Sequence, residues 1–245
     1  MSEFESLRGL VLSGVRYGET SLIVHIYTDK LGRQSFMVNG AARKGKRPGK
    51  LALFQPLSLL TIVASLPRKG SLLRIQEVVS PASGLYTNSD LRKGAIAVFL
   101  AEILYKTLRE EEPNPPLFDF LWNSVELLDA AEKGIANFHL VFMAQLSRYL
   151  GFYPIVAADE SSTIFFDIKN GRFQDTLPAH PIVLPAQLSR LMLQVFQTSL
   201  SGIDQLQLNR DLRNHLADGL VDYYQHHHEG VGNIKSLAVL KEVFA

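Results

Sequence analysis

The chain has 245 residues, of which 47% are hydrophobic and 20% are charged, so it can bury one large core or two modest ones. It contains no cysteine, which excludes disulfides, thiolate nucleophiles and cysteine-based zinc sites. The N-terminus is acidic and lacks the apolar segment of a signal peptide, and no apolar run is long enough to span a bilayer. We therefore expect a soluble cytoplasmic protein.

The net charge of +1 hides a strong asymmetry along the chain. Residues 1–80 hold 12 Lys and Arg against 5 Asp and Glu, whereas residues 81–245 hold 13 against 19. A basic first third joined to an acidic remainder indicates two domains with different partners. We place their boundary between residues 80 and 81.

Short alternating segments separated by Gly, Pro and Asp turns predict five strands in the first eighty residues. The expected strands are Leu10–Tyr17, Thr20–Thr28, Arg33–Gly40, Pro56–Leu66 and Ser71–Val79. Five short strands with one long basic loop fit an OB-type barrel, which is a common platform for single-stranded nucleic acid. The pattern fits another small barrel without a ligand equally well.

The long loop carries five cations in eight residues and no acid between Gly40 and Lys50. Its Gly and Pro residues exclude a helix, and a flexible basic loop can neutralise the phosphates of a nucleic acid. A solvated surface loop is the alternative. The candidate nucleic-acid ligands are Arg33, Arg43, Lys44, Lys46, Arg47, Lys50, Arg68 and Lys69.

Tyr27 is the candidate platform for base stacking near these cations. It shares a predicted strand face with Ser21 and His25, opposite the apolar face formed by Leu22, Val24 and Ile26. A partly buried barrel aromatic is the alternative, and for Phe36 and Phe54 that alternative is at least as good.

From Ser89 onward the hydrophobic period becomes helical, with Asn88 or Ser89 as the expected N-cap. A first helix runs to Glu110. The other expected helices are Leu117–Ala131, Ile135–Leu150, one from about Pro185, Leu208–Tyr224 and Ile234–Phe244. Gly151 and Pro154 mark the end of the third helix. Asn170-Gly171 predicts a hairpin with a type I′ turn inside the helical domain, near residues 164–184. The fold class is therefore α+β, with a five-stranded OB-type barrel followed by a mainly helical domain.

The sequence gives little support for an enzyme. It has no P-loop and no Gly-x-Ser-x-Gly motif, and Asp167 and Asp175 are two scattered acids. His226, His227 and His228 invite a metal site, but neighbouring residues of a helix point about 100° apart and rarely converge on one ion. We expect a binding protein without metal or cofactor. An OB-fold RNA-binding protein and a metal-dependent hydrolase built on the histidines are the competing hypotheses.

Several motifs, in order along nearly the whole chain, make it resemble the RecO family of bacterial recombination mediators. They are Arg8-Gly9-Leu10-Val11-Leu12, Tyr17-Gly18-Glu19-Thr20-Ser21-Leu22-Ile23-Val24, Leu31-Gly32, Val38-Asn39-Gly40-Ala41, Leu53-Phe54-Gln55-Pro56, Glu112-Pro113-Asn114-Pro115-Pro116-Leu117-Phe118, Tyr149-Leu150-Gly151-Phe152-Tyr153-Pro154 and Ile234-Lys235-Ser236-Leu237. Each motif is modest alone, and their order and spacing make the match specific.

The resemblance implies a DNA repair protein that binds single- and double-stranded DNA and anneals complementary strands. It also implies contacts with the acidic tail of single-strand-binding protein and with RecR, to help load RecA, and association with the bacterial nucleoid during repair. Lys133 and Arg148, beside and on the third predicted helix, are the candidates for the tail pocket. Many relatives carry a four-cysteine zinc module. This chain has no cysteine, so we expect the hairpin to take that place by packing.

Overall fold

The structure is a computed structural model that describes residues 3–40, 50–66, 72–79, 90–157 and 163–244. By its internal contacts the chain divides into two compact units, Met1–Asp129 and Ala130–Ala245. The first unit contains two helices in addition to the barrel. Whether residues 1–80 form a domain that folds alone stays a prediction.

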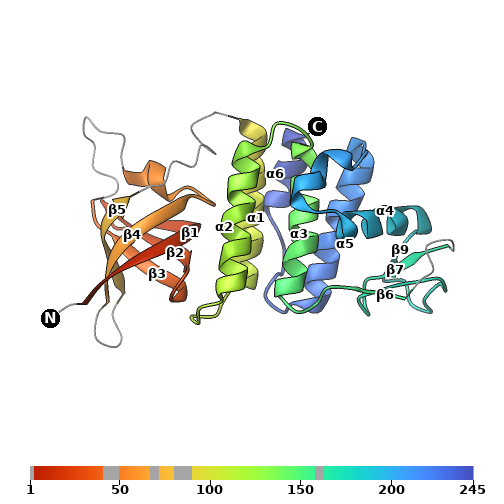
Figure 1. Cartoon of the computed structure of the whole chain (residues 1–245), viewed down its shortest axis with the longest axis horizontal. Coiled ribbons are helices and arrows are strands. Elements are labelled where there is room, and N and C mark those ends of the chain that lie inside the picture. Colours follow the sequence, from red (N-terminus) through yellow and green to blue (C-terminus); the bar gives the residue numbers. More distant parts are fainter. Residues whose placement is uncertain (1–2, 41–49, 67–71, 80–89, 158–162, 245) are drawn as a thin grey trace. The chain divides into compact units, whose positions relative to one another are not determined.

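The N-terminal strands close into a five-stranded barrel in the order β1-β2-β3-β5-β4 (Figure 1), as predicted. All neighbours are antiparallel except β3 and β5, which are parallel. The bounds are β1 Glu3–Tyr17, β2 Ser21–Thr28, β3 Gly32–Val38, β4 Leu59–Leu66 and β5 Leu73–Val79, with a 3-10 helix η1 at Lys50–Phe54 before β4. This connectivity is that of an OB-type barrel.

The barrel interior follows from the alternation of apolar residues along β2. Leu22, Val24 and Ile26 are 5%, 0% and 0% exposed and point inward, as the sequence predicted. Phe36 of β3 and Ile62 of β4 complete the centre of this core. Because one face of every strand packs in this core, only the outer face and the ends of the barrel can bind a ligand.

Strand β1 begins seven residues earlier than the sequence predicted. Its first half pairs with β4 and its second half with β2, with a register shift between Val11 and Ser13. Gly9 pairs on one side with Leu60 of β4 and on the other with Thr28 of β2, and a Cβ atom there would stand 2.4 Å from the Ile26 Cγ2 atom. The acidic start of β1 is therefore part of one long strand that changes its pairing partner within a single closed barrel.

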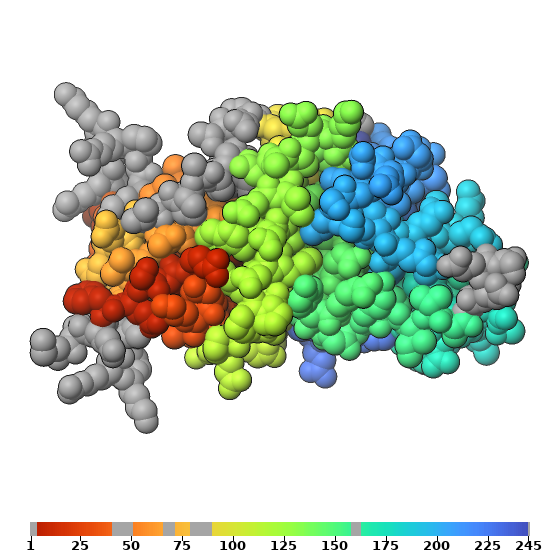
Figure 2. Space-filling view, in the orientation of Figure 1, coloured from red at the N-terminus to blue at the C-terminus, as the bar shows by residue number. Residues whose placement is uncertain are grey.

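Two helices follow the barrel in the first unit, α1 at Leu91–Thr107 and α2 at Pro115–Ala130. Asp90, rather than Asn88 or Ser89, caps α1, because its carboxylate accepts a hydrogen bond of 2.9 Å from the Arg92 amide. The Asn114 Oδ1 atom accepts a bond of 3.2 Å from the Leu117 amide at the start of α2. In the space-filling view the side chains of α2 (yellow-green) lie against the barrel (red to orange) (Figure 2).

The second unit is mainly helical, as predicted, and carries a small sheet. Its elements are η2 Ile135–Asn137, α3 Phe138–Tyr149, β6 Ile155–Val156, β7 Phe165–Asp167, β8 Arg172–Gln174, β9 Val183–Leu184, α4 Ala186–Gln197, η3 Leu200–Gln205, α5 Arg210–His227 and α6 Ser236–Val243. Gly151 follows α3 in the left-handed conformation with a φ of 82°, which confirms the predicted helix end.

The predicted hairpin is present, but its turn differs. Strands β7 and β8 pair through Asp167 and Arg172, which leaves a connection of four residues rather than two. A type I′ turn needs a positive φ at both central residues, and here only Gly171 has one, at 64°. The Asp167 carboxylate instead builds the turn by accepting bonds of 2.9 and 2.8 Å from the backbone and side-chain nitrogens of Asn170.

Aromatic rings form the core beneath this small sheet. Phe166 and Phe173, from β7 and β8, stack with centroids 4.4 Å apart, and Phe196 of α4 and Tyr223 of α5 pack edge-on or tilted against them. Such pairs stabilise a small sheet beyond the area that they bury. In this chain, therefore, ring packing holds the hairpin onto the helices.

Candidate nucleic-acid interface

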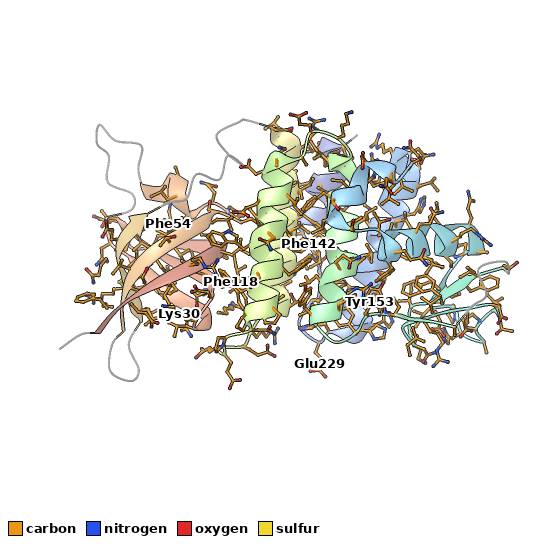
Figure 3. The ribbon with its side chains drawn as sticks, viewed as in Figure 1. Lys30, Phe54, Phe118, Phe142, Tyr153 and Glu229 are labelled. Carbon is orange, nitrogen blue, oxygen red and sulfur yellow. The ribbon has the colours of Figure 1, made fainter. Side chains whose placement is uncertain are left out.

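Tyr27, the candidate stacking residue, is buried. Its side chain lies on the outer face of the barrel as predicted, but it is only 3% exposed because α2 covers that face. Its ring stacks on Phe118 with centroids 6.4 Å apart, and Phe118 points from α2 towards the barrel (Figure 3). Burial, with a smaller contribution from Glu110, raises the pKa of Tyr27 to about 12. The prediction that Tyr27 offers its face to a base is wrong for this structure.

The side chain of Arg33 also binds other parts of the protein. Its guanidinium donates hydrogen bonds of 2.8 and 2.9 Å to the carbonyls of Tyr105 and Leu108, and it lies 4.1 Å from the centroid of the Tyr105 ring. Those carbonyls end α1, where backbone acceptors lack helical partners. Arg33 therefore caps α1 and joins it to β3, a role that competes with the predicted phosphate contact.

The same face carries His25 and Arg8. The His25 ring meets Tyr105 at 5.2 Å and bonds the Ser35 hydroxyl at 2.9 Å. Arg8 lies 5.1 Å from Phe118 and 5.4 Å from Trp122, in an aromatic contact that also brings it within 3.6 Å of the Asp119 carboxylate. The part of the outer surface around Arg8, His25, Tyr27 and Arg33 is thus closed by α1 and α2. We call it the covered face.

Most of the predicted cations lie outside the described residues. Arg43, Lys44, Lys46, Arg47, Arg68 and Lys69 belong to this group, and so does the side chain of Lys50. The chain leaves the described part after Gly40, just beyond β3, and re-enters it at η1. Their contribution to DNA binding stays a prediction.

Two further arginines of the barrel were missed by the sequence reasoning. Arg16, next to the tip of the β1–β2 hairpin, and Arg74 of β5 are exposed and have no hydrogen bond or ion pair within the described residues. The other described barrel cations are engaged: Lys30, for example, lies 3.3 Å from the Glu5 carboxylate. An exposed arginine without an intramolecular partner can bind a phosphate through its guanidinium group.

Lys133 and Arg148, the candidates for a partner-peptide pocket, stand at opposite ends of α3. Lys133 precedes η2 and Arg148 lies in the last turn of α3, so roughly 20 Å of helix separates them at 1.5 Å per residue. They therefore cannot stand at the mouth of one small pocket. The Arg148 guanidinium lies 3.7 Å from the centroid of the Tyr153 ring.

The three consecutive histidines take three separate partners. The His226 ring bonds the Asp222 carbonyl at 2.8 Å, the His227 ring bonds the Ile168 carbonyl at 2.7 Å, and the His228 Nδ1 atom accepts from the Gly230 amide at 3.3 Å. Within the described residues, no three His, Cys, Asp or Glu side chains are grouped so that they could hold a metal ion. Asp167 belongs to the hairpin turn: burial would raise its pKa, but hydrogen bonds from Asn170 and the nearby His180 hold the pKa below its usual value.

Two family models match the chain and together cover most of it. The model described as Recombination protein O N terminal matches residues 1–82, and the model described as Recombination protein O C terminal matches residues 88–238. The chain belongs to the RecO family. In the part of the chain that the structure describes, no helix is both long and apolar enough to cross a membrane.

Curated relatives agree with this assignment over nearly their whole length. The chain is 39% identical over 238 residues to the DNA repair protein RecO of Phocaeicola vulgatus, covering 97% of this chain and 98% of the relative. It is 39% identical to the RecO protein of Bacteroides fragilis, covering 96% and 97%, and 35% identical to that of Flavobacterium psychrophilum, covering 97% and 98%.

Proposed function

We propose that this RecO-family chain is a non-enzymatic DNA repair mediator of the bacterial cytoplasm. It binds single- and double-stranded DNA and anneals complementary strands. With RecR, it helps to load RecA onto DNA coated by single-strand-binding protein. The observation that carries the proposal is the pairing of RecO-family membership with a basic OB-type barrel at the N-terminus.

The charge of the barrel region supports a phosphate ligand. Its excess of seven positive charges is concentrated in the run from Arg43 to Lys50, while several other cations of the barrel are occupied by acids, carbonyls or rings. Each phosphate that a cation neutralises releases condensed counterions, so binding by this run will weaken as salt rises. A surface that neutralises two strands at once also lowers their mutual repulsion, which favours annealing.

Replacing Arg43, Lys44, Lys46, Arg47 and Lys50 by alanine tests the role of the basic run. If four or five of these charges reach phosphates, the log–log salt slope for single strands should flatten by roughly 3 to 3.5. A matched control removes the same charge from the second unit, at Lys133, Lys169, Arg172, Arg210 and Lys235. An unchanged salt slope in the variant without the basic run would show that these five residues do not contact phosphates.

Annealing tests the function itself. Complementary labelled strands are mixed with single-strand-binding protein, with and without the chain, and duplex formation is followed over time. The proposal expects faster annealing with the chain present. A competitor RNA of the same sequence separates DNA from RNA binding, because tighter binding to RNA together with no annealing would favour the OB-fold RNA-binding alternative.

The second unit is proposed to bind the acidic C-terminal tail of single-strand-binding protein. Such a tail has acidic residues followed by an apolar end, so its binding site should place a cation next to an apolar or aromatic surface. Arg148 meets this requirement because its guanidinium lies against the Tyr153 ring. Titration of a labelled tail peptide against the full chain should show weaker binding for Arg148→Ala than for Lys133→Ala. Equal affinities for the two variants and the unmodified chain would remove Arg148 from the site.

A further inference from the structure

The outer face of the barrel has an open part as well as the covered face. A single hydrogen-bonded row crosses it from strand to strand. The row pairs Val15 with Ile23, Ile23 with Met37, Met37 with Arg74, Arg74 with Ser65, and Ser65 with Phe4. Directly paired residues point to the same side of a sheet, so these side chains all lie on the outer surface of the closed barrel, and the row runs around it.

Exposed aromatic rings lie at both ends of this row. Phe4 is 61% exposed at one end, and Tyr17, two residues beyond Val15 on β1, is 57% exposed at the other. Ile23 and Met37 are half-buried between them and form an apolar floor. Both rings stand on the outer surface of the barrel, at opposite ends of β1.

Arg74 stands in the middle of the row, on the outer surface. Arg16 precedes Tyr17 in β1 and is paired with Leu22, whose side chain points into the barrel, so Arg16 lies at the exposed rim near the β1–β2 turn and not on the outer surface. Neither arginine has a partner among the described residues. On the covered face, by contrast, Arg8 and Arg33 lie on aromatic rings of the same unit. Among the described residues, the open part of the outer surface therefore carries two exposed aromatic rings and one arginine without a partner.

We propose that the unpaired bases of a single-stranded nucleic acid stack on Phe4 and Tyr17, while its phosphates meet Arg74 on the outer surface and Arg16 at the rim of the barrel. This inference rests on the proposed function and names the face of the barrel that performs it. A ring can stack only on a base whose face is free, so the site selects single strands over duplexes. OB-type barrels commonly take their ligands on β2 and β3. Here α1 and α2 cover these strands around Tyr27 and Arg33, so the nucleic acid follows the row past the uncovered Ile23 and Met37.

Single substitutions to alanine at Phe4 and Tyr17 test the stacking. Both side chains are mostly exposed, so the variants should keep the fold, which circular dichroism checks. Each change should weaken binding to a dT oligonucleotide roughly tenfold, while affinity for a duplex changes little. A uridine ribo-oligonucleotide of equal length is the second arm, and it shows whether the site distinguishes DNA from RNA.

The double variant Arg16→Ala with Arg74→Ala tests the phosphate contacts. It should flatten the single-strand salt slope by about 1.4, at 0.7 per phosphate contact. Lys169→Ala with Arg172→Ala is the control, because it removes two exposed cations from the second unit. This control should leave the slope unchanged.

Tyr17→Trp adds a direct readout, since stacking on a base should quench the new indole fluorescence. The proposal is overturned if the unmodified chain binds single strands and the Phe4 and Tyr17 variants bind them equally well. It is also overturned if those variants lose only capture of purified RecR, because the face would then be a protein-docking surface. If the unmodified chain binds no nucleic acid, the proposed function fails together with this inference.

Discussion

The covered and open faces of the barrel carry the same kinds of residue and use them differently. On the covered face, Tyr27 stacks on Phe118 and Arg33 caps α1, so an aromatic and a cation hold the helices onto the strands. On the open face, no other described residue packs in this way against Tyr17 or Arg74. A tyrosine and an arginine on the outer surface of a barrel can therefore either bind a ligand or hold a helix. Which of the two they do depends on whether another element packs against them.

The comparison also separates stability from binding. Truncating a side chain of the covered face leaves a cavity between strands and helices, which lowers the free energy of unfolding. Truncating one of the open face removes a possible ligand contact and should leave the free energy of unfolding nearly unchanged. Two residues of the covered face, Tyr27 and Arg33, have a counterpart of the same type on the open face. The pairs Tyr27 with Tyr17 and Arg33 with Arg74 can therefore be tested side by side.

The largest effect is expected for Tyr27→Ala. It deletes a buried ring between β2 and α2, and the free energy of unfolding should fall by about 3 kcal/mol, measured by urea denaturation. Tyr17→Ala should change this free energy by less than about 0.5 kcal/mol. A stable Tyr27→Ala protein that has lost its affinity for single strands would reverse the roles assigned to the two faces.

A smaller loss of stability is expected for Arg33→Ala. The change removes two charge-assisted hydrogen bonds to the end of α1 and a contact with the Tyr105 ring, so unfolding should become easier by about 2 kcal/mol. The salt slope for DNA should stay the same. Arg74→Ala should show the opposite pattern, with unchanged stability and a flatter slope. Equal slopes for both variants would argue against the division of roles.

The smallest effect concerns pH. Burial, with a contribution from Arg33, lowers the pKa of His25 below the ordinary value of 6.5. As the pH falls below 6.5, the unfolded chain therefore binds a proton at His25 more readily than the folded chain does, and stability falls. His25→Asn should make the free energy of unfolding less dependent on pH as the pH falls below 6.5. Identical pH profiles for the two proteins would show that the environment of His25 does not lower its pKa.

The general architecture could be predicted because local patterns dictate it. The alternation of Leu22, Val24 and Ile26 sets the inner face of the barrel, and Gly151 ends α3 because it adopts a left-handed conformation. The start of β1 could not be seen, since its first half pairs with β4 and its pattern is interrupted by a register shift. The turn at Asn170 depends on the Asp167 carboxylate, which the dipeptide signal does not include.

The candidate site was less predictable, because it depends on contacts between elements distant in the sequence. Tyr27 and Phe118 are 91 positions apart, and nothing near either residue indicates that they stack. Tyr17 carried a usable signal, since it sits beside Arg16 at a Gly18 turn, where side chains are commonly exposed. Arg74 carried none, because its position opposite Met37 follows from the parallel pairing of β3 and β5.

The most direct test of the open-face account is photo-crosslinking. A single-stranded oligonucleotide containing 5-iodouracil is bound to the full chain and irradiated, and the crosslinked residues are identified by mass spectrometry. The account predicts adducts at Tyr17 and Phe4, which lie at the two ends of the exposed row. Adducts concentrated at Tyr27, Tyr105 or Phe118 would show that α1 and α2 leave the covered face when DNA binds, and would contradict the account.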